Sequence, residues 1–296
     1  MHAFEYREPR SLEEAYAALA AYGEDARPVA GGTALVLLMR LGLARPGCLV
    51  SLRRIAGLGA ISAADGVIRL GALVTHRRAE RDPLVGTRLP LLTEAYRHVA
   101  TVRIRNAATV GGGLAHGDPA QDPPAALLAL DARVRLSSAA GSRTIPLHDF
   151  YRDYYETVLQ PGELLTELEV PMPPAGARWG FIKFLPRTAD DYGTVTVAVA
   201  LTLDGTGAHC REARIGLTCV GPTPIRARRA EAVLRGARLT PELLRAAAEE
   251  VRNEVQPTSD LRGSAEYKRD MAVLFTRRAL EQALAQPAGN PPQDRR

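Results

Sequence analysis

The sequence predicts an α+β protein with two domains, and three observations support this prediction. Apolar residues recur at helical spacing in some segments and at every second position in others, so both helices and strands are expected. In the second half of the 296-residue chain, strands come first and helices follow, which is typical of a separate α+β domain. In the first half, two glycine-rich turns lead out of apolar segments, Ala30-Gly-Gly-Thr33 and Thr109-Val-Gly-Gly-Gly113.

The first domain is expected to span residues 1–175, and its first lobe about residues 1–55. Ser11-Leu-Glu-Glu14 has capping-box spacing and opens a helix. After the first glycine turn, residues 33–42 indicate a short helix with Thr33 as its cap and Gly42 as its terminator. The apolar stretch 48–52 completes the lobe.

The second lobe, about residues 56–175, mixes strands and helices. Its expected strands are residues 67–71, 133–136 and 164–170, and its expected helices are residues 76–80, 90–100 and 123–130. The second glycine turn should end in a loop, residues 114–121, before Asp122 and Pro123 open a helix in the favoured order of cap and proline. Residues 171–176 are rich in proline and are interpreted as a linker.

The second domain is expected to span residues 176–285. Its expected strands are residues 179–185, 194–203 and 213–220, and its expected helices lie near residues 225–235, 241–253 and 264–284. Strict alternation puts large apolar side chains on one face of the middle strand, namely Val195, Val197, Val199, Leu201 and Leu203. Thr and Ala occupy its other face and are small enough for helices to pack closely. Residues 286–296 should form a disordered tail.

Composition argues against several classes of protein. The chain is 46% hydrophobic and 24% charged, which suits a globular protein with a sizeable core. It has no apolar run of about 18 residues and no apolar stretch at its start, so we expect a cytoplasmic protein without a membrane span. The net charge is +5, but arginines and acids are interspersed, so a nucleic-acid role is not expected. One exception, Arg226-Ala-Arg-Arg229, is a candidate exposed docking surface or simply a solvated helix face.

The cysteines and histidines indicate neither a metal site nor a catalytic set. Cys48, Cys210 and Cys219 are widely scattered, so we expect no disulfide framework, no iron–sulfur cluster and no zinc site on this chain. Four dispersed histidines are interpreted as loop or core residues rather than catalysts: His76, His98, His116 and His148.

The two glycine turns predict a ligand that carries phosphate. Glycine lets backbone amides approach a ligand, and consecutive amides in a tight turn form a donor nest for anionic oxygens. Two such turns suggest one diphosphate held from two sides, although glycine pairs often only turn a chain. The Gly-x-Gly-x-x-Gly and Gly-x-x-x-x-Gly-Lys-Ser/Thr signatures do not occur, which argues against a Rossmann domain and a P-loop.

Several motifs, in order along the chain, resemble the FAD-binding subunit of molybdenum hydroxylases. The motifs are Ala30-Gly-Gly-Thr33, Leu70-Gly-Ala-Leu-Val-Thr-His76, Ile104-Arg-Asn-Ala-Ala-Thr-Val-Gly-Gly112, Asp118-Pro-Ala-Gln-Asp122 with Leu127-Leu-Ala-Leu130, and Tyr154-Tyr-Glu-Thr-Val-Leu-Gln-Pro-Gly-Glu-Leu-Leu165. That family includes the medium subunit of aerobic carbon monoxide dehydrogenase and the FAD domain of xanthine dehydrogenase. The resemblance implies a two-lobed vanillyl-alcohol-oxidase-type (PCMH-type) FAD-binding domain followed by a smaller α+β C-terminal domain of the carbon monoxide dehydrogenase flavoprotein type.

The resemblance also implies which residues bind FAD. The implied donors to its diphosphate are Ala30, Gly31, Gly32, Thr33 and Ala34 on one side, and Thr109, Gly111, Gly112 and Gly113 on the other. Asp122 matches the acid that contacts the adenosine portion, although it also suits a helix cap. Tyr192 matches a tyrosine that approaches the flavin ring, and Lys183 matches a lysine near the cofactor; a surface turn residue and a solvated strand residue are the alternatives.

Two departures from the family pattern concern the second turn. Many relatives have Asn where this chain has Gly113, so only a backbone donor is expected there. Relatives also often have Gly at the position of Ala108. Neither change removes the expected phosphate nest.

The function implied by the resemblance is electron transfer within a multi-subunit enzyme. Substrate oxidation would occur at a molybdenum cofactor on a large subunit, and two 2Fe-2S clusters on a small subunit would pass electrons to the FAD and then to an external acceptor. A dimer of heterotrimers is the implied assembly. Two alternatives stay open: a self-sufficient FAD-dependent reductase or oxidase resembling the enolpyruvyl-UDP-N-acetylglucosamine reductases, and a scaffold that has lost FAD.

Overall fold

The computed structural model describes residues 3–186, 188 and 190–286. The chain forms two compact units that interleave along the sequence. Unit 1 comprises Met1–Ala79, Thr101–Gly117 and Arg133–Val170, and unit 2 comprises Glu80–Ala100, Asp118–Ala132 and Pro171–Arg296. The boundaries expected near residues 55 and 175 stay predictions, and the tail expected at residues 286–296 lies outside the described residues except for Gln286.

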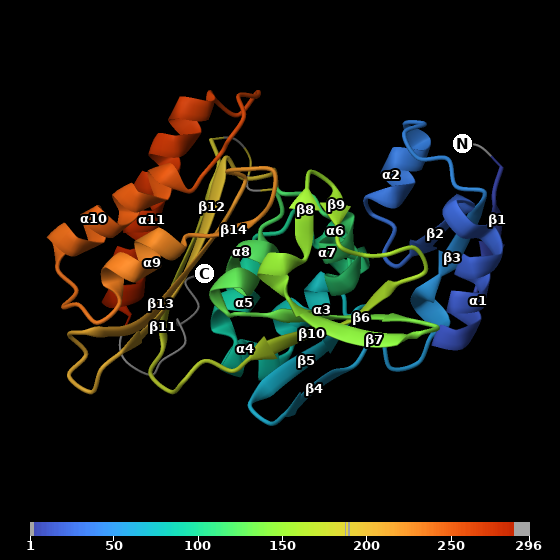
Figure 1. Cartoon of the computed structure of the whole chain (residues 1–296), viewed down its shortest axis with the longest axis horizontal. Coiled ribbons are helices and arrows are strands. Elements are labelled where there is room, and N and C mark those ends of the chain that lie inside the picture. The colour runs from blue at the N-terminus through green and yellow to red at the C-terminus, as the bar shows by residue number, and fades with distance from the viewer. Residues whose placement is uncertain (1–2, 187, 189, 287–296) are drawn as a thin grey trace. The chain divides into compact units, whose positions relative to one another are not determined.

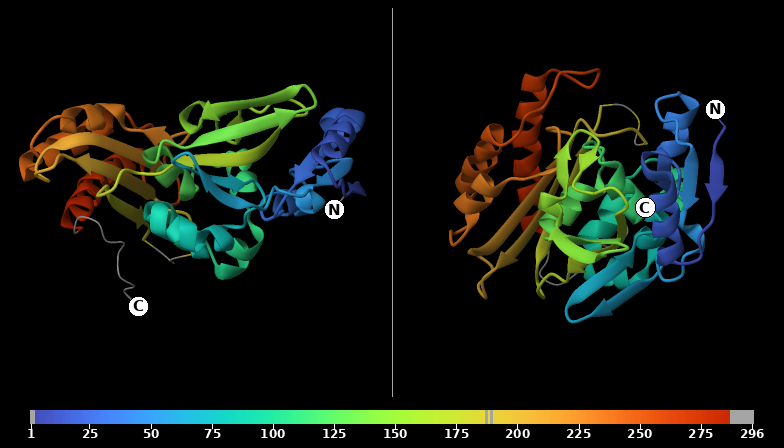
Figure 2. Two further views of the ribbon diagram at one scale, coloured as in Figure 1. Left: turned by 90° about the horizontal axis from the view of Figure 1, so that it is seen from below. Right: turned by 45° about the vertical axis from the view of Figure 1, so that its right-hand side comes forward.

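A small parallel sheet in unit 1 is ordered β1-β3-β2. Its strands are β1 (Glu5–Arg7), β2 (Ala26–Val29) and β3 (Cys48–Ser51). Helix α1 (Leu12–Tyr22) packs against it with Ala15, Tyr16 and Leu19 buried (Figure 2). The Ser11 hydroxyl accepts a 3.2 Å hydrogen bond from the Glu14 amide, which confirms Ser11 as the cap.

A larger sheet in unit 1 is ordered β4-β5-β10-β6-β7, and a two-stranded ribbon lies between β7 and β10 in the chain. The strands of the larger sheet are β4 (Ile61–Ala64), β5 (Val67–Gly71), β6 (Arg133–Ser138), β7 (Gly141–Pro146) and β10 (Leu164–Pro171). The ribbon consists of β8 (Tyr151–Asp153) and β9 (Glu156–Thr157). Three short helices complete unit 1: α2 (Leu35–Arg40), α6 (Val102–Ala107) and α7 (Val110–His116). Helix α3 (His76–Arg81) lies where the chain passes from unit 1 to unit 2.

Two local expectations for unit 1 were wrong. Helix α2 begins only at Leu35, and its N-cap position is held by Ala34 without a side-chain hydrogen bond, so Thr33 is not the cap. The glycines after Thr109 form the first turn of helix α7 instead of a turn followed by a loop, because the Thr109 hydroxyl caps them. Thr109 has an extended conformation and caps this helix, which therefore starts at Val110 despite the low helix propensity of the three glycines that follow.

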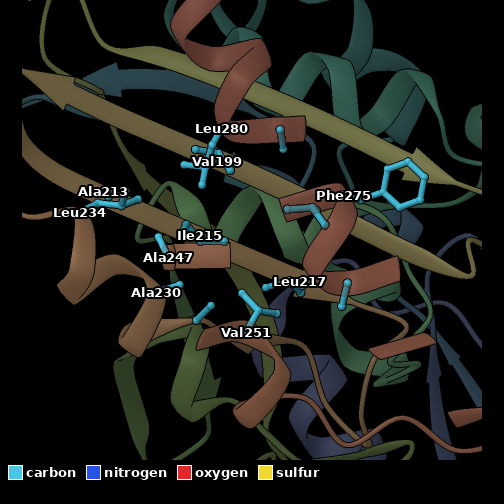
Figure 3. Packing of buried hydrophobic residues seen from close by; sticks show 14 of the residues in the cluster. Val199, Ala213, Ile215, Leu217, Ala230, Leu234, Ala247, Val251, Phe275 and Leu280 are labelled. Atoms are coloured by element: carbon cyan, nitrogen blue, oxygen red, sulfur yellow. The ribbon is translucent and has the colours of Figure 1, made fainter. Parts of the chain in front are cut away.

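Unit 2 is built on one antiparallel sheet ordered β11-β12-β13-β14. Its strands are β11 (Arg178–Phe184), β12 (Val195–Leu203), β13 (Cys210–Thr218) and β14 (Ile225–Arg226). Helices α9 (Arg228–Leu234), α10 (Pro241–Glu250) and α11 (Ala265–Ala285) cover one face (Figure 1). Val199 and Ile215 lie opposite each other in register and pack among these helices (Figure 3), as the alternation predicted.

The other face of this sheet carries the small residues and packs against α8 (Pro123–Ala129). All seven residues of α8 are buried. A Cβ at Gly216 in β13 would overlap the carbonyl oxygen of Ala125, so the helix and the strand are in backbone contact. Helix α5 (Pro90–Arg97) packs against α8 and β11, and α4 (Pro83–Arg88) precedes it in the chain. Along the described stretches of the chain, no helix combines the length and the apolar character that crossing a membrane requires.

Candidate cofactor site

The two glycine turns, about 80 residues apart in sequence, meet within unit 1. A Cβ at Gly31 would overlap the carbonyl oxygen of Ala107 and lie 3.1 Å from the Cα of Ala108. A Cβ at Gly112 would lie 3.5 Å from the Cβ of Ala30. Only glycine permits the first of these approaches, so the structure brings together the two motifs that the sequence singled out.

The first turn offers a run of unused backbone donors. Residues 30–34 are half-buried, and within the described parts of the chain no carbonyl or side chain accepts a hydrogen bond from their amides. Their carbonyls do take part in the fold, because Gly32 accepts from Val36 and Ala34 accepts from Leu38, each at 3.0 Å. Gly32 has a φ of 70°, which turns the chain between β2 and α2. Five successive free amides in such a turn suit an anionic ligand.

The second turn uses its amides internally. Gly111 donates to the carbonyl oxygen of Ala72 and Gly113 to that of Thr109, each at 2.9 Å. Gly112 donates to the Thr109 hydroxyl at 3.1 Å, and its backbone is exposed. The donor roles expected of Thr109, Gly111, Gly112 and Gly113 toward a ligand therefore stay predictions. The backbone of Gly112 carries no side chain and is exposed next to Ala30.

Asp122 and Lys183 form a buried ion pair in unit 2. The Lys183 ammonium donates to the Asp122 carboxylate at 2.8 Å and to the His98 carbonyl at 2.9 Å. The hydroxyl of Thr196 donates to the other carboxylate oxygen at 3.0 Å. The Asp122 and Lys183 side chains are only 5% and 1% exposed. Burial raises the pKa of the Asp122 carboxyl, although Lys183 and Thr196 act in the opposite direction.

This pair overturns two interpretations and leaves two untested. Asp122 occupies the N-cap position of α8, but its side chain makes no capping hydrogen bond because it is turned to Lys183 and Thr196. Lys183 is not a solvated strand residue, because its ammonium is buried. The expected contacts of Asp122 with adenosine and of Lys183 with the cofactor stay predictions. Lys183 and Thr196 lie opposite each other in register, so the pairing of β11 with β12 explains why both bind the Asp122 carboxylate.

Tyr192 lies on the connection between β11 and β12, with 44% of its surface exposed. The Arg262 guanidinium lies 5.7 Å from the centre of its ring. The expected contact of Tyr192 with a flavin stays a prediction. Arg226 is not an exposed docking residue, because its guanidinium is bound by Asp131 and Glu231 at 3.0 and 2.7 Å.

Cysteine, histidine and carboxylate side chains form no metal centre of three or more ligands in the described residues. Cys48 and Cys210 are buried, Cys219 is half-buried, and all three are free thiols. Burial raises the pKa of Cys210 to about 11 and that of Cys219 to about 12. These thiols are therefore protonated and unreactive near neutral pH.

His76 is buried, in agreement with its interpretation as a loop or core residue. Its contact with the backbone of Thr109 at the second glycine turn was not predicted. Its place in the motif 70–76 was the available signal, because that motif follows strand β5 directly.

Comparison with known proteins gives the same assignment over nearly the whole chain. Residues 2–173 match the family described as FAD binding domain in molybdopterin dehydrogenase, and residues 181–283 match CO dehydrogenase flavoprotein C-terminal domain. The carbon monoxide dehydrogenase medium chain of Afipia carboxidovorans is 39% identical over 282 residues, covering 95% of this chain and 97% of that one. The 6-hydroxypseudooxynicotine dehydrogenase complex subunit alpha of Paenarthrobacter nicotinovorans is 37% identical, covering 95% and 94%. A chain of carbon monoxide dehydrogenase from Hydrogenophaga pseudoflava superposes with a TM-score of 0.92 at 39% identity, covering 95% and 97%.

Proposed function

The chain belongs to the family of FAD-binding subunits of molybdopterin dehydrogenases, and from this premise we propose that it transfers electrons within a molybdenum-containing hydroxylase. It is an oxidoreductase subunit, and FAD is its cofactor. When bound, FAD supplies the redox chemistry, while the protein supplies position and electrostatics.

One observation carries the proposal: residues 30–34 have five free amides, and the first residue of this turn, Ala30, lies next to the exposed backbone of Gly112. A diphosphate has several anionic oxygens and needs donors that no other acceptor occupies. In our proposal the first turn donates most of the hydrogen bonds. Thr109, Gly111, Gly112 and Gly113 line the other side at close backbone distance, and Thr109 adds a hydroxyl.

Three residues of unit 2 are proposed to contact other parts of the cofactor. Asp122 would meet the adenosine portion with the lone pairs that Lys183 and Thr196 leave unused, since a carboxylate accepts up to about four hydrogen bonds. Tyr192 would shield one face of the flavin ring and limit its reaction with oxygen. Lys183 would lie near the cofactor and hold the Asp122 carboxylate in place through its hydrogen bond.

The proposed partners are a large subunit with the molybdenum cofactor and a small subunit with two 2Fe-2S clusters. Electrons would pass from the clusters to the FAD on this chain and then to an external acceptor. A dimer of heterotrimers in the cytoplasm is the assembly and location that we propose.

The proposal is tested by the flavin content of the purified chain and of two glycine variants. Gly31→Ala places a methyl group against the Ala107 carbonyl and forces the two turns apart, so we expect FAD affinity to fall about tenfold or more. Gly59→Ala is the matched control, because no atom lies within 4 Å of its Cβ. The measurement is the absorption spectrum after adding and removing excess FAD, followed by chromatography of the released cofactor.

The outcomes separate the alternatives. FAD bound by the wild type and Gly59→Ala but lost by Gly31→Ala supports the diphosphate site. A wild-type chain that takes up no FAD would contradict the proposal and support the scaffold alternative. A chain that reduces a substrate with NADPH without partners would support the self-sufficient reductase.

A further inference from the structure

We propose that His76 is a positioning residue for FAD binding, because its imidazole fixes the backbone at which the two glycine turns meet. The identity of the ligand rests on the proposed function. The geometry rests on contacts within unit 1 alone.

A short strap, residues 72–76, holds the start of helix α7. Gly111 donates to Ala72, Val110 donates to Val74, and the amide of His76 donates to Ala108, all at 2.9 Å. Thr75 and Thr109 pair as an isolated antiparallel bridge. The strap therefore continues from strand β5 and fixes four consecutive residues at the second turn.

The His76 ring adds a bond to the residue that organises this turn. Its Nε2 lies 3.2 Å from the carbonyl oxygen of Thr109. A carbonyl oxygen only accepts hydrogen bonds, so Nε2 carries the proton and donates. The same carbonyl accepts from Gly113, and the Thr109 hydroxyl accepts from Gly112. His76 thus orients the peptide that sets the conformation of the glycines.

The neighbouring peptide, 108–109, borders the first turn. Ala108 precedes Thr109, and its Cα lies 3.1 Å from the position that a Cβ on Gly31 would take. A rotation of the 109–110 peptide, which shares the Cα of Thr109 with the 108–109 peptide, would therefore move the surface against which Gly31 packs. His76 as a residue is 5% exposed, so no water competes freely for the Thr109 carbonyl.

His76 acts as a neutral donor and not as a cation toward phosphate. Burial and the nearby Arg105 lower its pKa to about 4, although the bond to Thr109 acts in the other direction. At neutral pH the ring therefore carries one proton, and the bond to Thr109 determines which nitrogen holds it.

The test compares His76→Leu, which removes the donor, with His76→Gln, which keeps an N–H donor at a similar reach. We expect the dissociation constant for FAD to rise about tenfold in His76→Leu, which is what one lost buried hydrogen bond is worth, and to stay within about threefold in His76→Gln. His76→Met, unbranched and without a donor, is a second variant if His76→Leu does not fold. Titration of the FAD-free proteins with FAD, followed by flavin fluorescence, gives these constants.

Leu168→Ala separates positioning from general stability. Leu168 is fully buried in strand β10 of the same unit and is not one of the residues of either turn or of the strap. The variant Leu168→Ala should lower the unfolding midpoint of the FAD-free chain at least as much as His76→Leu does. Its affinity for FAD should stay within about threefold of the wild-type value. An FAD affinity that falls equally in Leu168→Ala and His76→Leu would overturn the positioning role.

A second readout does not depend on FAD. Amide hydrogen exchange of Val110 and Gly111 in the FAD-free chain should speed up about tenfold in His76→Leu but not in His76→Gln, because the ring keeps their strap in place. Unchanged exchange in His76→Leu would overturn the inference. If exchange is faster in His76→Leu than in the wild type but the wild type binds no FAD, the proposed function would be contradicted. The role of His76 in positioning the second turn would still stand.

Discussion

Asp122 and Lys183 are each other's counter-ions in the interior of unit 2. Each side chain is buried, and each has its counter-ion within 2.8 Å. Burying a single charge without its partner is far more costly than burying both. The stability of unit 2 therefore depends on the pair more than on either residue alone.

Removal of either partner of this ion pair should lower the free energy of unfolding. Asp122→Asn leaves the Lys183 ammonium buried beside a neutral amide, so we expect the free energy of unfolding to fall by about 3–5 kcal/mol. The measurement is urea unfolding of the FAD-free chain. The double variant Asp122→Asn with Lys183→Met is the control and should recover part of the loss, because it removes the stranded charge. A loss below about 1 kcal/mol in Asp122→Asn would contradict a buried pair.

His76 should make the stability of unit 1 depend on pH. Its pKa is about 4 in the folded chain, against an ordinary value of 6.5, so between these values the unfolded chain binds more protons. The stabilisation is therefore complete above pH 6.5 and is lost as the pH falls toward 4. The expected difference is about 3 kcal/mol, from about 1.4 kcal/mol for each pH unit.

His76→Gln is the reference that isolates this effect, because other groups titrate in the same range. The free energy of unfolding is measured from pH 7.5 to 4 for both proteins. We expect the wild type to lose about 3 kcal/mol more than the variant. Parallel curves would show that His76 has an ordinary pKa in the folded chain.

The sequence singled out candidate site residues without identifying their hydrogen-bond partners. The glycines of both turns, Asp122 and Lys183 were recognised from motifs. Their contacts were not, because Lys183 and Asp122 are 61 positions apart and His76 and Thr109 are 33 apart. Only tertiary packing decides whether a carboxylate caps its own helix or pairs with a distant lysine.

At the scale of elements, the contact between helix α8 and strand β13 should tolerate no added atoms. Gly216→Ala places a methyl group against the Ala125 carbonyl, so the helix must move away from the sheet. We expect the free energy of unfolding to fall by about 1–3 kcal/mol, as for other overpacked cores. Gly205→Ala is the control, because its Cβ meets no atom within 4 Å. Equal unfolding midpoints in urea for the two variants would contradict the close packing.

Elements with strong periodicity and the capped helix α1 were predicted well, whereas the glycine-rich helix α7 was not. The alternation of residues 194–203 predicted both the strand β12 and its buried face. Helix α7 was missed because three consecutive glycines argue against a helix, and the cap at Thr109 and the strap at residues 72–76 outweigh that preference. Long-range hydrogen bonds of this kind leave no periodic signal in the sequence.

At the scale of the whole molecule, the interleaved units bear on whether the second domain folds alone. The sheet of unit 2 is closed on one face by α9, α10 and α11, which follow it in the chain. Its other face is closed by α5 and α8, which precede residue 176. A fragment of residues 176–296 would therefore expose the face that carries Ala198 and Gly216, together with the buried rings of Trp179 and Phe181.

We expect this fragment not to fold cooperatively by itself, because an uncovered apolar sheet face favours aggregation or a loosely packed state. Co-expression with residues 1–175 supplies α5 and α8 and should restore a cooperative unfolding transition, which makes it the matched control. The measurements are urea unfolding and the dispersion of amide resonances. A dispersed spectrum from residues 176–296 alone would contradict this expectation, because the sheet would then need only the helices that follow it in the chain. Residue 175 would in that case be the boundary between two independently folding domains.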